Sequence, residues 1–65
     1  MKRVKIIEFR GNRSQIEMAN IYGVSQQAWS KYENGTTKPE LELMVKISND
    51  MGEKIEDIFL DQSTT

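Results

Sequence analysis

The chain contains no cysteine and no histidine. Disulfide frameworks, Cys/His zinc sites and catalysis by either side chain are therefore excluded, and we expect neither a metal nor another cofactor. Without such a base and without a glycine-rich phosphate loop, the chain is not expected to be an enzyme. The longest apolar runs are two or three residues. They are too short for a signal peptide or a membrane span, so a cytoplasmic location is expected.

The charged residues are divided unevenly along the 65-residue chain. Residues 1–38 carry seven basic and three acidic side chains, a net charge of +4, whereas residues 39–65 carry two and seven, a net charge of −5. The total of −1 conceals this division. A basic half beside an acidic half suggests one face turned toward a polyanion and another turned away from it.

The residues from 25 to 35 predict a short helix with two different faces. Ser25 is a good N-cap, and Gly35 can supply the left-handed residue that ends a helix. At about 100° per residue, the apolar side consists of Ala28, Trp29 and Tyr32. The other side carries Gln26, Gln27, Ser30, Lys31 and Asn34. This carboxylate-free row of hydrogen-bonding groups is what reading base edges in a major groove requires, although it could also be a solvated polar face.

A second helix is predicted directly before this one. Ser14 followed by Glu17 is typical of a capping box, and Gly23 ends the segment. Its expected inner face is formed by Met18, Ile21 and Tyr22. Because only Val24 separates Gly23 from the next N-cap, the two helices must cross steeply, which predicts a helix-turn-helix.

The remaining segments predict three more helices and no sheet. Residues 4–10 fit a helix or a short strand, of which we prefer the helix, and residues 36–39 form a polar loop. A longer helix follows, with an apolar stripe of Leu41, Met44, Val45, Ile47, Ser48 and Met51. A last short helix covers residues 55–59. The expected fold is all-α with five helices, one domain at 1–60 and a polar tail at 61–65.

Taken together, these residues resemble the lambda repressor and Cro family of helix-turn-helix domains, also called the XRE or Cro/C1 type. The resemblance is carried by Ser14, Gln15, Glu17, Ala19, Gly23, Val24, Ser25, the run from Ser30 to Gly35, Lys38, Pro39, Leu41, Ile47, Gly52, Ile55, Ile58 and Phe59. It covers roughly residues 4–60 and implies a five-helix, lambda-repressor-like domain that binds double-stranded DNA.

The resemblance also implies roles for individual residues. Base contacts are expected from Gln26, Gln27, Ser30 and Lys31. Phosphate contacts are expected from Arg10, Arg13, Ser14, Gln15, Ser25, Asn34, Thr36, Thr37 and Lys38, although Arg10 and Arg13 could equally be solvated charges. A homodimer would place two recognition helices about 34 Å apart, with a possible interface at Ile58, Phe59 and Leu60.

The chain departs from the family at three positions. Glu8 occupies the place where the family often has an arginine that pairs with the equivalent of Glu33. Either Arg10 or Arg13 reaches Glu33 instead, or Glu33 lies unpaired near the DNA face and weakens binding. Arg13 replaces a usual leucine. Trp29 replaces a smaller aliphatic residue, and its ring must fit a small core, unless it stacks on single-stranded bases.

The predicted function is a sequence-specific, DNA-binding transcriptional regulator, a repressor acting as a homodimer on an inverted repeat. Two alternatives remain open. The domain could be an antitoxin with a protein partner, or a protein-interaction module with little affinity for DNA. An unpaired Glu33 and the acidic pI of about 5.3 would favour the last of these.

Overall fold

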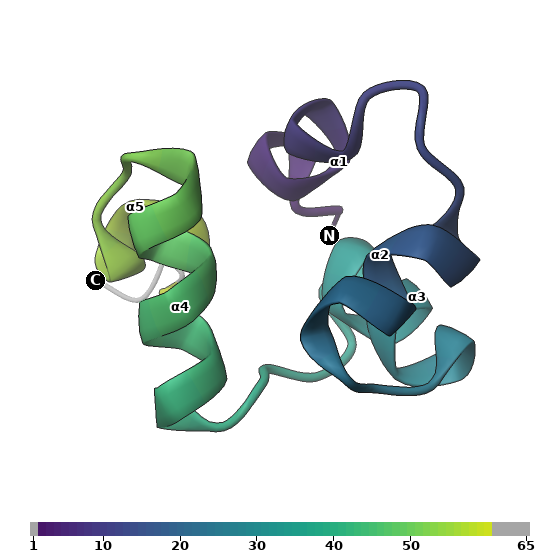
Figure 1. Cartoon of the computed structure of the whole chain (residues 1–65). Coiled ribbons are helices and arrows are strands. Elements are labelled where there is room, and N and C mark those ends of the chain that lie inside the picture. Colours follow the sequence, from purple (N-terminus) through teal and green to yellow (C-terminus); the bar gives the residue numbers. More distant parts are fainter. Residues whose placement is uncertain (1, 61–65) are drawn as a thin grey trace.

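The computed structural model describes residues 2–60, within which the chain forms five helices and no strand (Figure 1). In chain order these are α1 (Val4–Arg10), α2 (Gln15–Tyr22), α3 (Gln26–Asn34), α4 (Leu41–Met51) and α5 (Ile55–Ile58). The predicted all-α fold is confirmed. The tail expected at 61–65 lies outside the described residues. No helix within 2–60 is long and apolar enough to cross a membrane.

The starts of α2 and α3 are fixed by local hydrogen bonds. Glu17 donates its backbone N–H to Ser14 Oγ at 3.0 Å, and Ser14 donates its own to Glu17 Oε1 at 2.8 Å, which is the predicted capping box. Ser25 Oγ accepts from the backbone N–H of Ala28 at 3.1 Å. Each cap gives a free first-turn N–H its partner, so the sequence sets where both helices begin.

The turn between α2 and α3 depends on Gly23. Its φ of 70° lies in the left-handed region, which a residue with a Cβ adopts only with strain. The backbone N–H of Val24 then donates to Ala19 O at 2.9 Å and closes the end of α2. The chain can therefore begin α3 immediately, as the helix-turn-helix prediction required.

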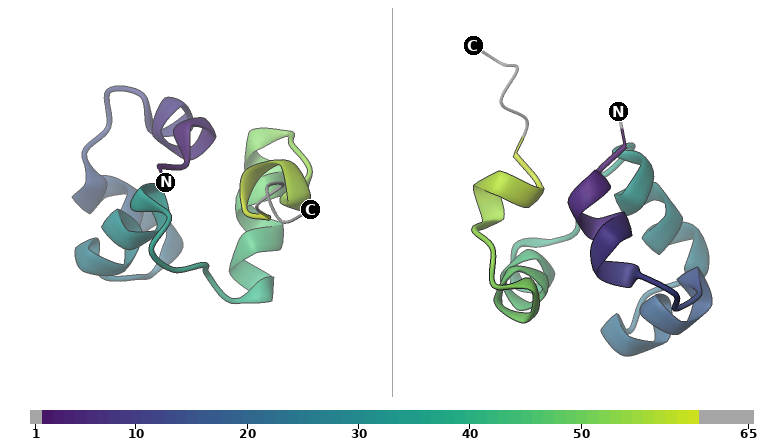
Figure 2. Two further views of the ribbon diagram at one scale, coloured as in Figure 1. Left: turned by 180° about the vertical axis from the view of Figure 1, so that it is seen from behind. Right: turned by 90° about the horizontal axis from the view of Figure 1, so that it is seen from above.

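The core draws one fully buried side chain from each of the first four helices. These are Ile6, Met18, Trp29 and Ile47, each 0% exposed. Figure 2 shows α1, α2 and α3 grouped on one side of the molecule and α4 with α5 on the other. The core cluster spans both groups. Short helices are only marginally stable in isolation. In a domain of this size, packing into a shared core therefore provides most of their stability.

The buried face of α4 contains Met44, Ile47, Ser48 and Met51, as predicted, but it differs from the predicted stripe at three other positions. Ile47 is buried and Leu43 packs against the core, whereas Leu41 and Val45 are 67% and 40% exposed. The prediction was wrong for Leu41 and Val45, because the apolar stripe is wider than the part of α4 that the core covers. It was also wrong for Ile21 of α2, which is 48% exposed.

The capping box gives the first testable prediction. We expect Ser14→Ala to lower the free energy of unfolding by about 1 kcal/mol, because the backbone N–H of Glu17 loses its acceptor. Urea unfolding followed by circular dichroism measures this change. Ser30→Ala removes a mid-helix hydroxyl that caps no helix, and this control should stay within about 0.5 kcal/mol of the wild type. Equal losses of unfolding free energy in the two variants would contradict the role of Ser14 as the N-cap of α2.

Candidate nucleic-acid interface

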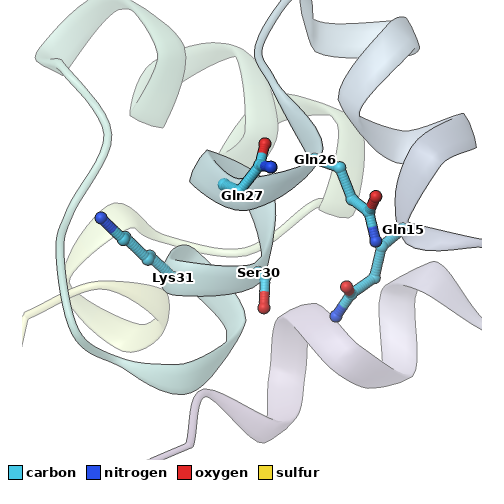
Figure 3. Close-up of a pocket in the computed structure, with 5 residues that line it drawn as sticks. All are labelled: Gln15, Gln26, Gln27, Ser30 and Lys31. Atoms are coloured by element: carbon cyan, nitrogen blue, oxygen red, sulfur yellow. The ribbon is translucent and has the colours of Figure 1, made fainter.

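An open recess lies along the outer face of α3 and reaches the start of α2 (Figure 3). Its lining consists of Gln15, Gln26, Gln27, Ser30 and Lys31. Figure 3 shows Gln15 beside Gln26 at one side, while Lys31 extends away at the other. The lining offers amide, hydroxyl and ammonium groups and contains no carboxylate. The structure thus brings the four expected base-reading residues together on one surface.

The opposite face of α3 is held in the core by aromatic packing. Trp29 stacks on Tyr22 with ring centroids 5.5 Å apart and an interplanar angle of 2°, and it meets Tyr32 edge-on at 6.0 Å. Because Trp29 is fully buried, it offers no surface for a base to stack on. Rolling α3 about its axis would expose this ring, so the packing decides which face of the helix points outward.

A buried carboxylate lies beside this packing. Glu33 is 2% exposed, and its oxygens accept from Arg10 Nε at 2.7 Å, Trp29 Nε1 at 2.7 Å and Gln15 Nε2 at 2.9 Å. These donors come from α1, α3 and α2 respectively. Arg10 therefore replaces the arginine that the family would place at Glu8. The hydrogen bonds from Trp29 and Gln15 were missed. The i,i+4 spacing of Trp29 and Glu33 on one helix could have indicated the first, whereas Gln15 lies 18 residues from Glu33 and no local spacing indicates the second.

The surroundings of Glu33 favour its charged form. Burial alone would raise the pKa of Glu33, but hydrogen bonds from Arg10, Gln15 and Trp29 and the positive charge of Arg10 together hold it below its usual 4.5. Glu33 is therefore a paired anion inside the domain. It is not an unpaired negative charge on the outer face of α3, and the argument that this feature would weaken DNA binding no longer applies.

Arg10 and Arg13 both direct hydrogen bonds toward the protein. Arg10 also donates from Nη1 to Arg13 O at 3.0 Å. Arg13 donates to Phe9 O at 2.7 Å and Arg10 O at 3.2 Å, and its guanidinium lies 5.1 Å from the centre of the Phe9 ring. Two arginines thus close the C-terminal end of α1, where positive charge is favourable. They are not simple solvated charges.

Arg3 is a structural residue that the sequence analysis missed. Its Nη1 donates to Tyr32 O at 2.6 Å and to Thr37 O at 2.7 Å, and its guanidinium lies 5.4 Å from the centre of the Phe59 ring. Arg3 thereby ties the end of α3 to the following loop. Its partners lie 29 and 34 residues away, so no sequence spacing could have indicated them.

The other expected phosphate-binding residues lie at the ends of α2 and α3. The exposed members are Ser14, Ser25, Asn34, Thr36, Thr37 and Lys38. Ser14 and Ser25 accept with their hydroxyl oxygens as helix caps, which leaves each hydroxyl hydrogen available to donate. The loop carrying Thr36, Thr37 and Lys38 keeps its side chains outward while Arg3 holds its backbone.

The interface expected at the C-terminal helix requires correction. Ile58 and Phe59 are 6% and 3% exposed and belong to the core cluster, whereas Leu60 is 44% exposed. The expectation of a partner surface was wrong for Ile58 and Phe59, because the small core needs both side chains for its own burial. Leu60 is the accessible member of the three.

Two short helices joined by a tight turn, with a polar outer face on the second, define the helix-turn-helix class. A profile of the helix-turn-helix family matches residues 5–58, so the chain belongs to this family, in its Cro/C1 type. The family is one of DNA-binding transcriptional regulators.

One similar protein is the SPbeta prophage-derived uncharacterized HTH-type transcriptional regulator YonR of Bacillus subtilis (strain 168). The two are 35% identical over 51 residues, which cover 78% of this chain and 47% of the relative. The chain therefore spans about half the length of that relative. No solved structure matches the chain.

The buried ion pair gives a stability prediction. We expect Arg10→Met to lower the free energy of unfolding by about 3–5 kcal/mol, because it leaves Glu33 charged and poorly compensated. Lys5→Met is the matched control in the same helix, since Lys5 pairs with Glu53 at 3.6 Å on the surface. It should cost at most about 1 kcal/mol. Urea unfolding of both variants provides the comparison. Similar losses of unfolding free energy would show that the buried Arg10–Glu33 pair contributes no more than the surface pair.

The lowered pKa of Glu33 gives a prediction about pH. The bond from Gln15 favours the ionised carboxylate, so its contribution is complete above the unfolded pKa of about 4.5 and is lost as the pH falls through the lower folded pKa. Gln15→Ala should therefore cost about 1–2 kcal/mol at pH 7 and progressively less in acid. Gln26→Ala, which removes an exposed amide that does not contact Glu33, should differ from the wild type equally at every pH. A pH-independent effect of Gln15→Ala would contradict the assignment.

Proposed function

We propose that this chain is a sequence-specific DNA-binding regulator that inserts α3 into the major groove. The observation that carries the proposal is the carboxylate-free outer face of α3, lined by Gln26, Gln27, Ser30 and Lys31 and set by the burial of Trp29. A rigid helix with exposed amides matches the donor and acceptor pattern of base edges in that groove. Membership of a family of DNA-binding regulators supports the same function.

The residues of this face divide into two roles. Gln26 and Gln27 lie in the first turn of α3 and would choose bases, with Lys31 reaching a guanine or a phosphate and Ser30 near the groove wall. The start of α2 and the loop with Lys38 would hold phosphates on either side, helped by the positive end of the α2 dipole. Phosphate contacts would supply most of the affinity, and α3 would supply the sequence choice.

The regulatory mechanism that we propose is occlusion of a promoter by a homodimer on an inverted repeat. Two copies would present α3 to successive major grooves about 34 Å apart. The net charge of +4 over residues 1–38 supports approach of this half to DNA. The acidic second half would face away.

A protein partner is the second candidate. The exposed Leu41 and Val45 on α4 favour it, because paired aliphatic side chains on one helix face are typical of contact surfaces. The antitoxin interpretation depends on such a partner, and co-purification of a second small protein would support it.

Selection of bound duplexes from a random pool, followed by titration at two salt concentrations, tests the proposed function. We expect a two-fold symmetric consensus bound at least about 10³-fold more tightly than unrelated DNA. Binding without enrichment that disappears at physiological salt would contradict the proposal and favour the protein-interaction alternative.

Two substitutions test the division of roles. Gln27→Ala should cost about 1–3 kcal/mol on the selected duplex and relax the preference at one base position, because it removes a base contact. Lys38→Ala should weaken binding to all duplexes alike and lower the salt slope by about one, because it removes a phosphate contact. Each serves as the control for the other. Identical effects on selected and unrelated DNA in both variants would contradict the division.

A further inference from the structure

The Glu33 carboxylate also affects the recess on α3, because it accepts a hydrogen bond from Gln15, which lines that recess. We propose that Glu33 is a positioning residue, whose carboxylate fixes the Gln15 amide with its nitrogen toward the core and its oxygen toward the recess on α3. The inference rests on the DNA-binding function proposed above, because it concerns which atoms the recess presents to DNA.

The two oxygens of the Glu33 carboxylate have different donors. Oε2 accepts from Arg10 Nε and Trp29 Nε1, each at 2.7 Å. Oε1 accepts from Gln15 Nε2 at 2.9 Å, and its other donor, Arg10 Nη2, is 3.4 Å away. Without Gln15, this buried oxygen would keep a single long hydrogen bond. Gln15 is therefore the principal partner of Oε1.

The carboxylate accepts only one orientation of the Gln15 amide. The amide nitrogen carries two hydrogens and the oxygen carries none, and a half-turn about the last side-chain bond exchanges the two ends. Glu33 is ionised and only accepts, so a reversed amide would place two oxygens against each other in a site that is 2% exposed. Leaving buried acceptors in that state is costly, and the amide is held with its nitrogen inward.

This orientation decides what Gln15 offers at the surface. Among the residues that donate to Glu33 within 2–60, Gln15 is the one that also lines the recess. One of its N–H groups is bound to Glu33, so its oxygen and its second N–H remain. The neighbouring Gln26, Ser30 and Lys31 all carry donors, and the oxygen of Gln15 gives them an acceptor among them.

The consequence for DNA is a restriction on how Gln15 can take part. A phosphate oxygen is itself an acceptor, so within the side chain of Gln15 it can use only the second amide N–H. The oxygen of Gln15 can pair with a donor, which is either a neighbouring side chain or an amino group on a base. The side-chain part of the phosphate contact expected from Gln15 is thereby restricted to one amide hydrogen, and Glu33 determines the direction of that hydrogen.

A double-mutant cycle on DNA affinity tests the positioning role. The wild type, Glu33→Gln, Gln15→Ala and the double variant are titrated with the duplex selected by the wild type, and affinities are corrected for the folded fraction. The amide introduced by Glu33→Gln can both accept and donate, so it no longer selects one orientation of Gln15. We expect Glu33→Gln to weaken binding about threefold or more when Gln15 is present and to have no further effect in Gln15→Ala.

Ile47→Val separates positioning from stability. Ile47 is fully buried on α4, is not among the donors to Glu33 and does not line the recess. The variant should lower the free energy of unfolding while the affinity of the folded protein stays within about twofold of the wild type. In the double-mutant cycle, Glu33→Gln could reduce DNA affinity equally in the wild type and in Gln15→Ala. That result would overturn the proposal and leave Glu33 a structural residue only.

A measurement on the free wild-type protein covers the case in which Glu33→Gln does not fold. In side-chain amide NMR spectra, one Nε2 hydrogen of Gln15 should exchange with solvent more slowly than those of Gln26 and Gln27. Exchange at the same rate in all three amides would overturn the proposal. If the wild type selects no duplex, the DNA-binding function fails, whereas the exchange rates still decide whether Glu33 holds the amide.

Discussion

The structure depends on one buried negative charge. A carboxylate that is 2% exposed is tolerated only if its oxygens are paired, and the donors to Glu33 come from α1, α2 and α3. Satisfying one group from three helices fixes their relative placement more narrowly than apolar contacts alone, because hydrogen bonds are directional. The helix-turn-helix is thereby locked against the first helix, and α3 has one outward face.

The same arrangement connects the core to the proposed interface. Trp29 packs between Tyr22 and Tyr32 and also donates to Glu33, so its ring both fills the core and pairs the charge. Gln15 donates a hydrogen bond to Glu33 and also lines the recess. Side chains that stabilise the fold thus also decide which polar atoms α3 and α2 present. Under the proposed function, stability and recognition therefore share residues in this small domain.

Features that depend on neighbouring residues could be predicted from the sequence, and those that depend on distant contacts could not. The cap at Ser14, the turn at Gly23 and the two faces of α3 follow from short spacings, and the structure confirms them. The sequence left Glu33 either paired with Arg10 or Arg13 or unpaired, and only the fold could select Arg10. The hydrogen bonds of Arg3 connect residues about half the chain apart. Which residues of α4 and α5 are buried depends on how these two helices pack against α1, α2 and α3. For that reason the exposure of Leu41, Ile58 and Phe59 was misassigned.

The most direct test of this account is a titration of isotope-labelled protein with the selected duplex, followed by backbone and side-chain NMR signals. We predict that the largest shifts fall on Gln26, Gln27 and Lys31 of α3 and at the start of α2, while the signal of the buried Trp29 indole persists. Shifts concentrated around Leu41 and Val45 of α4, with α3 unchanged, would contradict the claim that α3 is the surface that reads DNA.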